Sequence, residues 1–317
     1  MAVVLVTGGS GFLGSWVLRH LVDQGHRCVV FDLQKNSARW DTLLGERQAR
    51  VTFVEGDIAD SEAVGAALDK HAAEAVIHLG ALLTPECQED PLQGCRVNVL
   101  GMVSLFEQVR LRREQISRIS WASSLAVFGP IPESKLRTEV IDETHAPSFY
   151  GAFKRSAELI ARQYWKHFRV SSLGIRPHVI YGPERTAGLT AGPSLAARAI
   201  ARGESASINY SGMCGYDYVE DVARAMIRAA FEGPVGAHVV DLHSEQARPA
   251  DLVTILKDID QDAQVDWAGP HIPSNKPPRD TPISRIFTDW ETTSLREGLE
   301  RTIAFYRSGE CNASRSE

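Results

Sequence analysis

The sequence predicts an α/β protein built on a doubly wound parallel sheet, with a smaller C-terminal lobe interleaved with it. In the first 125 residues, short β-rich apolar runs alternate with helical patterns, which is typical of right-handed βαβ units. From about Tyr181 the texture changes, because Gly-Pro turns separate shorter and less regular elements. We therefore expect a first domain over residues 1–180 and a lobe over 181–310, some of whose segments return to the first domain's core.

Each predicted element follows from its local pattern. Strands are expected at residues 3–7, 28–32, 51–55, 75–79, 116–123 and 170–176. Helices are expected near residues 12–24, 61–69, 92–113, 151–168 and 295–306. The helix at 151–168 and the strand after it should close the sheet, and that strand should end before Pro177, which cannot donate a ladder hydrogen bond. Five prolines predict a long ordered loop or lid at 269–282, and residues 311–317 should be frayed.

Composition excludes several classes of protein. The chain has 317 residues, with 34 Lys+Arg against 40 Asp+Glu, so its net charge of −6 does not suit a nucleic-acid-binding protein. No apolar run approaches the roughly 20 residues that cross a bilayer, and no basic residue precedes Arg19 as a secretory signal would require. We expect a cytoplasmic protein with no membrane contact. The five cysteines form no C-x-x-C pair, so neither a disulfide framework nor a metal site is expected.

A glycine-rich turn joins the first strand to the first helix. Gly8, Gly11 and Gly14 allow the backbone to approach a pyrophosphate, and the helix N-terminus offers free amides to its charge. Asp32 ends the second strand, where a carboxylate accepts hydrogen bonds from the adenosine ribose and repels a 2′-phosphate. The turn therefore predicts a dinucleotide site that favours NAD over NADP, although Lys35 and Arg39 would admit NADP.

Two side chains on the fourth helix form a candidate acid/base pair. Tyr150 and Lys154 are four residues apart, so they lie on one helix face. An ammonium group beside a phenol favours the phenolate, so we expect Lys154 to lower the pKa of Tyr150. Ser124 lies at the C-terminal end of a predicted strand, where doubly wound sheets bind their ligands. The three residues together predict proton transfer at a substrate hydroxyl.

Further motifs follow in an order that is specific to one superfamily. They are Thr-Gly-x-x-Gly-x-x-Gly from Thr7, Glu55-Gly56-Asp57-Ile58, His78-Leu79-Gly80-Ala81, Val97-Asn98-Val99-x-Gly101, Ser123-Ser124-x-Ala126-Val127-Phe128-Gly129, Tyr150-x-x-x-Lys154, Arg176-Pro177 and Tyr181-Gly182-Pro183. Through them, residues 3 to about 235 closely resemble the extended short-chain dehydrogenase/reductase superfamily, specifically its NAD-dependent epimerase/dehydratase family. The resemblance implies a Rossmann fold, bound NAD and an oxidoreductase step.

The resemblance also implies a role for each matching residue. Tyr150 would exchange the hydroxyl proton, Ser124 would hydrogen-bond the same oxygen, and Lys154 would hold the nicotinamide ribose. Asn98 is explained equally well as a buried amide satisfied by backbone, and His178 would touch the nicotinamide end through its backbone. The implied cofactor contacts are Gly8, Gly11, Phe12, Leu13, Gly14, Asp32, Asp57, Ile58, Leu79, Gly80, Ala81, Asn98, Tyr150, Lys154 and His178.

Departures from the family pattern reduce the number of reactions that the chain is expected to catalyse. Dehydratases of this family usually carry an Asp-Glu pair directly after the catalytic serine or threonine, and Leu125 and Ala126 stand there. Nucleotide-sugar epimerases typically have asparagine at the position of Val179 and arginine just before the strand that here begins at Gly215. Because two contacts to a nucleotide diphosphate are missing, we favour an NAD-dependent oxidoreductase that acts on a secondary alcohol or ketone of a small sugar, sugar acid, polyol or similar compound.

Two alternatives stay open. One is a nucleotide-sugar 4-epimerase, which oxidises its substrate transiently with tightly bound NAD through the same catalytic residues. The other is a non-catalytic dinucleotide sensor, which the intact set of Ser124, Tyr150 and Lys154 disfavours.

Several residues are expected to face the substrate or a second subunit. Thr84, Ser124, Arg185 and Thr190 are the substrate candidates, and Arg185 is either a carboxylate or phosphate ligand or a solvated loop arginine. Tyr210, Tyr216 and Tyr218 alternate as strand core does, which we favour over a substrate platform. The resemblance implies a homodimer in which helices 92–113 and 151–168 form a four-helix bundle with their symmetry mates. Its apolar surface would come from Leu100, Val103, Phe106 and Val109, some of which must also contact the sheet.

Overall fold

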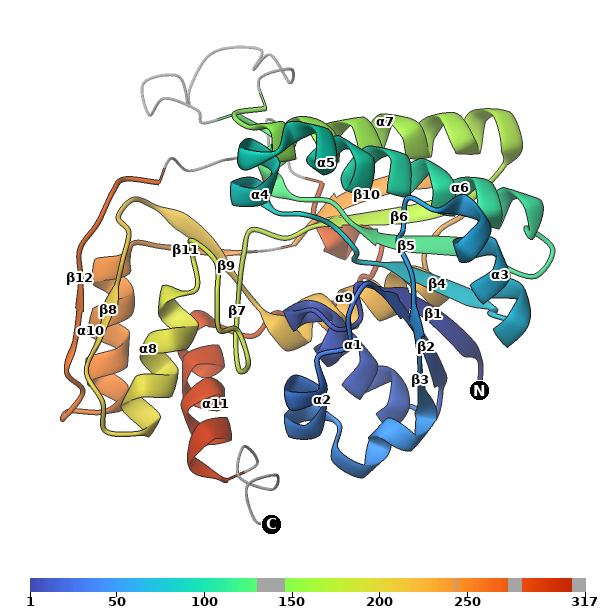
Figure 1. Cartoon of the computed structure of the whole chain (residues 1–317). Coiled ribbons are helices and arrows are strands. Elements are labelled where there is room, and N and C mark those ends of the chain that lie inside the picture. Colours follow the sequence, from blue (N-terminus) through green and yellow to red (C-terminus); the bar gives the residue numbers. More distant parts are fainter. Residues whose placement is uncertain (130–145, 243, 273–280, 310–317) are drawn as a thin grey trace.

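A seven-stranded parallel sheet forms the centre of the molecule (Figure 1). The computed structural model describes residues 1–129, 146–242, 244–272 and 281–309. In spatial order the strands are β10 (Ala237–Asp241), β6 (Ser171–Arg176), β5 (Arg118–Ala122), β4 (Ala75–His78), β1 (Val3–Thr7), β2 (Arg27–Asp32) and β3 (Val51–Glu55). The strand order reverses between β1 and β4, which is the point where such sheets bind ligands. The predicted doubly wound fold is confirmed.

Helices cover both faces of this sheet (Figure 1). The structure has α1 (Phe12–Asp23), α2 (Ser37–Leu43), α3 (Ser61–His71), α4 (Thr84–Glu89), α5 (Pro91–Cys95), α6 (Gly101–Leu111), α7 (Phe149–Phe168), α8 (Gly192–Ala201), α9 (Val219–Phe231), α10 (Pro249–Ile259) and α11 (Leu295–Arg307). Helices α3, α6 and α7 share one face, and α1 and α9 share the other. Because both faces are covered, strands such as β1 are almost continuously apolar.

The edge of the sheet beyond β6 differs from the prediction. The expectation that residues 151–176 close the sheet is wrong, because β10 pairs in parallel with β6 from Ala237 opposite Ser172 to Asp241 opposite Arg176. All six residues of β6 are buried. A strand buried on both faces needs a partner at each edge for its backbone hydrogen bonds. Strand β6 still ends at Arg176, as the following proline requires.

The predicted helix at 92–113 is divided into three parts. A π-helical segment, Arg96–Leu100, separates α5 from α6. On α6, Phe106 and Val109 are fully buried against the sheet, so these are the two of the four apolar residues that contact the sheet and not a partner. Leu100 remains 47% exposed. The apolar surface that remains for a partner subunit on this helix is therefore smaller than the sequence predicts.

The remaining elements form a smaller region beside the carboxyl ends of the strands (Figure 1). Strands β7 (Val179–Tyr181), β9 (Cys214–Tyr218) and β11 (Glu245–Ala247) form one small sheet, and β8 (Ala206–Ile208) pairs with β12 (Val265–Trp267). Tyr210, Tyr216 and Tyr218 are buried in the core, which confirms the prediction that they are core residues and not a substrate platform. Most of the proline-rich stretch, residues 273–280, and the expected frayed end, 311–317, lie outside the described residues. No described helix is long and apolar enough to cross a membrane.

Candidate active site

The glycine turn after β1 is packed too tightly for side chains. A Cβ on Gly14 would lie 2.2 Å from the carbonyl oxygen of Gly8, and one on Gly8, whose φ is +69°, would lie 2.6 Å from the amide nitrogen of Gly80. Helix α1 begins after Gly11 with no side chain capping its first amides. The bare turn and the free amides fit a pyrophosphate, because both the backbone approach and the positive helix end are available.

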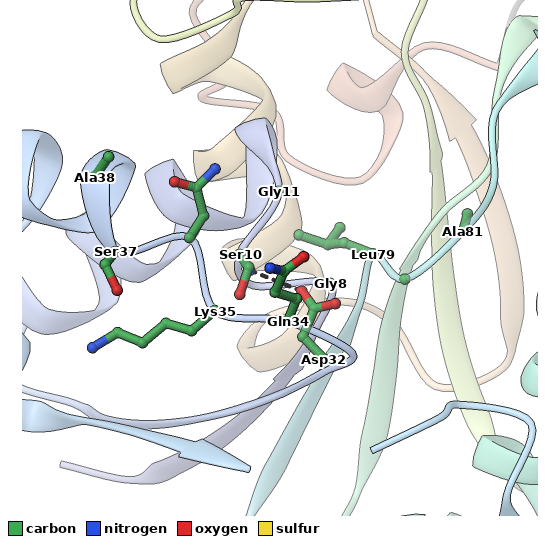
Figure 2. Close-up of a pocket in the computed structure, with 12 residues that line it drawn as sticks. Gly8, Ser10, Gly11, Asp32, Gln34, Lys35, Ser37, Ala38, Leu79 and Ala81 are labelled. Atoms are coloured by element: carbon green, nitrogen blue, oxygen red, sulfur yellow. Dashed lines mark hydrogen bonds between the residues drawn. The ribbon is translucent and has the colours of Figure 1, made fainter. Parts of the chain in front are cut away.

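Asp32 borders an open groove beside this turn (Figure 2). The groove has a volume of about 650 Å³ and is lined by Gly8, Ser10, Gly11, Asp32, Gln34, Lys35, Asn36, Ser37, Ala38, Leu79, Gly80 and Ala81. The Asp32 carboxylate accepts hydrogen bonds from the Ser10 amide at 3.0 Å and the Leu33 amide at 2.9 Å. Partial burial raises the pKa of Asp32, and these hydrogen bonds oppose the rise. Lys35 points away from Asp32, with Nζ 5.0 Å from the centroid of the Trp40 ring.

This geometry makes a prediction about the cofactor. Asp32→Asn removes the negative charge but keeps the shape, so the affinity for NAD should fall about 10- to 100-fold, which is the size of one charge-assisted hydrogen bond. Discrimination against NADP should weaken at the same time, because the repulsion of a 2′-phosphate is lost. Titration of the protein with NAD and NADP measures both effects. Glu55→Gln, opposite Asp32 on β3, is the control and should leave both affinities unchanged.

A second cavity continues from the turn across the ends of β4, β5 and β6, and we call it the inner cavity. It has a volume of about 380 Å³, which suits a small ligand. Its lining residues are Gly8, Gly11, Phe12, Leu13, Gly14, Arg39, Leu79, Ala81, Leu83, Ala122, Ser123, Ser124, Tyr150, Lys154, Pro177, His178, Ile180, Arg185, Thr186 and Ala187. The structure therefore brings Ser124, Tyr150 and Lys154 to one wall of a cavity that also contains the glycine turn.

The close approach of α7 to the end of β5 places these three side chains together. Ser148 caps α7 through the amide of Gly151, and a Cβ on Gly151 would lie 2.2 Å from the carbonyl oxygen of Ala126. Lys154 is 7% exposed and donates to the carbonyl of Ala122 at 2.8 Å. Its ammonium nitrogen lies 5.7 Å from the centroid of the Tyr150 ring.

The pKa values in this site correct one expectation. Burial raises the pKa of Tyr150 to about 12, and a hydrogen bond with Ser124 opposes the rise. Burial also lowers the pKa of Lys154 to about 8. The expectation of a lowered pKa for Tyr150 is therefore wrong, because the loss of water around the phenol outweighs the hydrogen bond with Ser124. Further positive charge beside the phenol would be needed to favour the phenolate.

His78 lies near Lys154 and makes stability depend on pH. Its Nδ1 is 2.7 Å from the hydroxyl of Thr7, and burial together with the charge of Lys154 lowers its pKa from 6.5 to about 3. Between these two values the unfolded chain binds more protons than the folded chain, so stability should fall as the pH decreases, by at most about 1.4 kcal/mol per pH unit.

Urea unfolding at several pH values checks this prediction. The His78→Gln variant should show a shallower fall in unfolding free energy than the wild-type protein over this range. His238→Gln, which removes an exposed histidine, should keep the wild-type slope. Equal slopes for all three proteins would contradict a neutral, buried His78.

Some of the predicted residues lie away from both cavities. Asp57 forms an ion pair with Arg96 at 2.8 Å, and Ile58 packs against Gly101. Asn98 bonds both the amide and the carbonyl of Leu82, at 2.8 and 2.9 Å, so it satisfies and fixes the loop after β4. The other residues absent from the two linings are Thr84 and Thr190.

Other lining residues were missed by the sequence-based predictions. Leu83, the residue that precedes α4, lines the cavity, whereas Thr84, the first residue of that helix, does not. Arg39 was noted only for NADP, yet it lines the inner cavity and donates to the carbonyl of Ser10 at 3.1 Å. The short helix α2 that carries Arg39 was not predicted; Asn36, which caps it through the amide of Arg39, was its one sequence signal.

His178 lines the inner cavity, and both its backbone amide and its ring are hydrogen-bonded to neighbouring protein groups. Its amide donates to Asp217 at 2.7 Å, and its ring nitrogen Nδ1 lies against the backbone of Gly215. Burial raises the pKa of Asp217 to about 6, and hydrogen bonds from His178 and Ser244 oppose the rise. Because the His178 amide is committed, only its carbonyl remains as a backbone contact for a bound molecule.

A buried cluster of charges ties the ends of the strands to α7, and we call Ser123, Arg155, Glu158, Arg176 and Asp241 the Glu158 cluster. Glu158 is fully buried and accepts from Arg176 at 2.6 and 2.8 Å, from Ser123 at 2.8 Å and from Arg155 at 2.9 Å. Arg176 also donates to Asp241 at 3.2 Å. Ser123 precedes Ser124, and Glu158 lies one turn after Lys154, so the cluster fixes the segments that carry the catalytic candidates.

Comparison with protein families identifies the chain. Residues 4–240 match the model of the NAD dependent epimerase/dehydratase family. The chain belongs to this family. The predicted resemblance is confirmed, and so is an NAD-dependent enzyme of the extended short-chain dehydrogenase/reductase type.

Individual members of the family show how far the likeness extends. UDP-glucose 4-epimerase of Mycolicibacterium smegmatis is 27% identical over 96% of this chain and 98% of its own length. The solved UDP-glucose 4-epimerase of Thermus thermophilus, a complex with NAD, superposes with a TM-score of 0.78 at 24% identity and covers 96% of this chain and 99% of that one. The dTDP-glucose 4,6-dehydratase of Bacillus anthracis, with NAD, reaches the same TM-score at 20% identity, covering 98% of each chain.

Proposed function

We propose that this chain is a nucleotide-sugar 4-epimerase that oxidises a secondary hydroxyl with bound NAD and reduces the resulting ketone again. The observation that carries the proposal is the inner cavity, which joins the glycine turn to Ser124, Tyr150 and Lys154. The preference for a nucleotide sugar rests on the family relatives, several of which are UDP-glucose 4-epimerases.

Three side chains would divide the work at one substrate oxygen. Tyr150 Oη takes the hydroxyl proton during oxidation and returns it during reduction. Ser124, already hydrogen-bonded to Tyr150, holds the same oxygen in line. Lys154 Nζ would hold the nicotinamide ribose, and Asp32 the adenosine ribose. Bound at the glycine turn and through these riboses, NAD would supply the hydride chemistry at the carbon that carries the hydroxyl.

The valine at position 179, where epimerases typically have asparagine, does not argue against a nucleotide-sugar substrate. Val179 is buried in the core and does not line the inner cavity, whereas its neighbours His178 and Ile180 do. Alternate residues of a strand face opposite sides, so the side chain at 179 points away from the substrate. The absence of asparagine there therefore does not argue against an epimerase.

A dehydrogenase of a small sugar, sugar acid or polyol is the second candidate, and the residues around Gly215 favour it. A Cβ on Gly215 would lie 2.7 Å from Nδ1 of His178 and 2.6 Å from Nε2 of Gln246. An arginine cannot be placed there without moving both, and the neighbouring Cys214 is 2% exposed. The described part of this strand offers no cation to a diphosphate.

We also propose a homodimer that docks through α5, the π-helical segment and α7. Leu92 is 82% exposed, Leu159 48% and Phe168 43%. Helices α5 and α7 pack against each other, and large apolar side chains left exposed on neighbouring helices are typical of interaction sites. Sedimentation of the wild-type protein should give a dimer, and Leu159→Glu should give a monomer.

Product analysis with purified protein separates the two enzymatic candidates. The protein is incubated with NAD and either UDP-glucose or a panel of free sugars, sugar acids and polyols, while NADH absorbance and the product sugar are both followed. Conversion of UDP-glucose to its 4-epimer without accumulating NADH supports the epimerase. Stoichiometric NADH from a free substrate overturns it and supports the dehydrogenase. If Tyr150→Phe retains a tenth or more of either activity, the proposed site is wrong.

A further inference from the structure

Among the residues that the structure describes, the inner cavity is lined by three cations and by no carboxylate. The cations are Arg39, Lys154 and Arg185. Arg39 donates to the carbonyl of Ser10 beside the glycine turn, so it belongs to the pyrophosphate side. Lys154 belongs to the catalytic wall and donates to Ala122. Arg185 is hydrogen-bonded to neither the glycine turn nor the catalytic residues within the described chain, so its positive charge is explained by neither.

Arg185 is held towards the smaller region rather than towards the glycine turn. Its guanidinium donates to the carbonyl of Ile180 and, at 2.8 Å, to the hydroxyl of Thr190. Thr190 thus does not line the cavity itself but orients a residue that does.

Within the described parts of the chain, no acidic group balances the charge of Arg185. No carboxylate in the described parts of the chain forms an ion pair with it, and burial lowers its pKa to about 10. A guanidinium has five N–H donors, and Ile180 and Thr190 take two of them. Arg185 is partly buried, and a guanidinium with unused donors that faces a ligand cavity is suited to bind an anion from outside the protein.

We propose that Arg185 binds an oxyanion of the substrate, either a phosphate of a nucleotide sugar or the carboxylate of a sugar acid. The inference rests on the proposed function in one respect, because it places the substrate in the cavity beside Tyr150. In this chain Arg185 supplies, from the loop after β7, the positive charge that the strand at Cys214 and Gly215 does not offer. The planar, forked guanidinium suits both phosphate and carboxylate.

Calorimetric titration of the NAD-loaded protein tests this. The probes are UDP, galacturonate and inorganic phosphate, with galactose as the uncharged comparison. At least one of the three anions should bind the wild-type protein, and Arg185→Gln should weaken that binding about 10- to 100-fold. Arg185→Lys should retain part of it, because lysine keeps the charge without the fork. Arg202→Gln, which removes an exposed charge at the end of α8, should change nothing.

Each other outcome overturns the inference. It fails if no anion binds the wild-type protein, if Arg185→Gln binds anions as tightly as wild type, or if Arg185→Gln loses affinity for NAD alone, since Arg185 would then hold the cofactor's pyrophosphate. Binding is measured without turnover, so the two proposals fail separately: Arg185-dependent anion binding in a protein that forms neither epimer nor NADH would refute the proposed function only. A preference for UDP indicates a nucleotide sugar, and one for galacturonate a sugar acid.

Discussion

Tyr150→Phe is expected to lower turnover about 100- to 10,000-fold, the range for loss of a positioned acid/base group. Only the hydroxyl is removed, so the ring still packs in the wall of the inner cavity and the affinity for NAD should change little. Turnover and NAD titration together measure the two effects. Ser124→Ala should cost part of the same rate, and the double variant should lose less than the product of the two losses, because both side chains act on one oxygen.

Tyr164→Phe provides the matched control. Tyr164 lies on the same helix, α7, and its hydroxyl contacts Glu107 at 3.2 Å, far along the helix from the inner cavity. This variant should keep wild-type turnover. If Tyr150→Phe retained a tenth of the wild-type rate or more, another group would have to move the proton.

Glu158→Ala is expected to lower the free energy of unfolding by about 3–5 kcal/mol, because it breaks a buried ion pair and leaves Arg176 with Asp241 as its remaining carboxylate partner. Burial alone would raise the pKa of Glu158, but hydrogen bonds and charge from Arg176 outweigh it and the pKa is lowered. The contribution of Glu158 is therefore present at neutral pH and is lost as the pH falls through that lowered value. Chemical unfolding followed by circular dichroism measures the loss.

A surface glutamate shows whether burial is the cause. Glu300 lies 3.7 Å from Arg296, and both side chains are about half exposed, at 50% and 47%. Glu300→Ala should cost about 0.5 kcal/mol or less, as exposed helix pairs do. A similar loss in both variants would mean that the Glu158 cluster contributes no more than a surface pair. Turnover should also fall in Glu158→Ala alone, since Ser123 adjoins Ser124.

Much of the sheet could be predicted because its signals are local. Each of the first six strands is a short apolar run, and the glycine turn, Asp32 and the Tyr150–Lys154 spacing belong to single segments. Strand β10 was not predicted, because its five residues carry no mark that distinguishes the edge of β6 from the smaller sheets. That choice depends on contacts between segments more than 60 residues apart in the chain.

The site was predicted least well where packing decides which way a side chain faces. The spacing of Tyr150 and Lys154 correctly placed both on one face of α7, but the pKa of Tyr150 depends on the burial that tertiary contacts create. The orientation of Arg185 is set by Ile180 and Thr190, which no sequence pattern connects to it. At Val179 the family pattern predicted a substrate contact, but packing turns this side chain into the core.

The place of β10 has a consequence for how the chain acquires its structure during synthesis. Strands β7, β8 and β9 all leave the ribosome before β10 does, so the sheet remains one strand short while most of the smaller region is already available to fold. Until residue 241 is made, β6 has one unpaired edge, which is a site for wrong pairing between nascent chains. A gene fragment that encodes only residues 1–180 would keep that edge permanently. The two regions therefore depend on each other for folding as well as for the site between them.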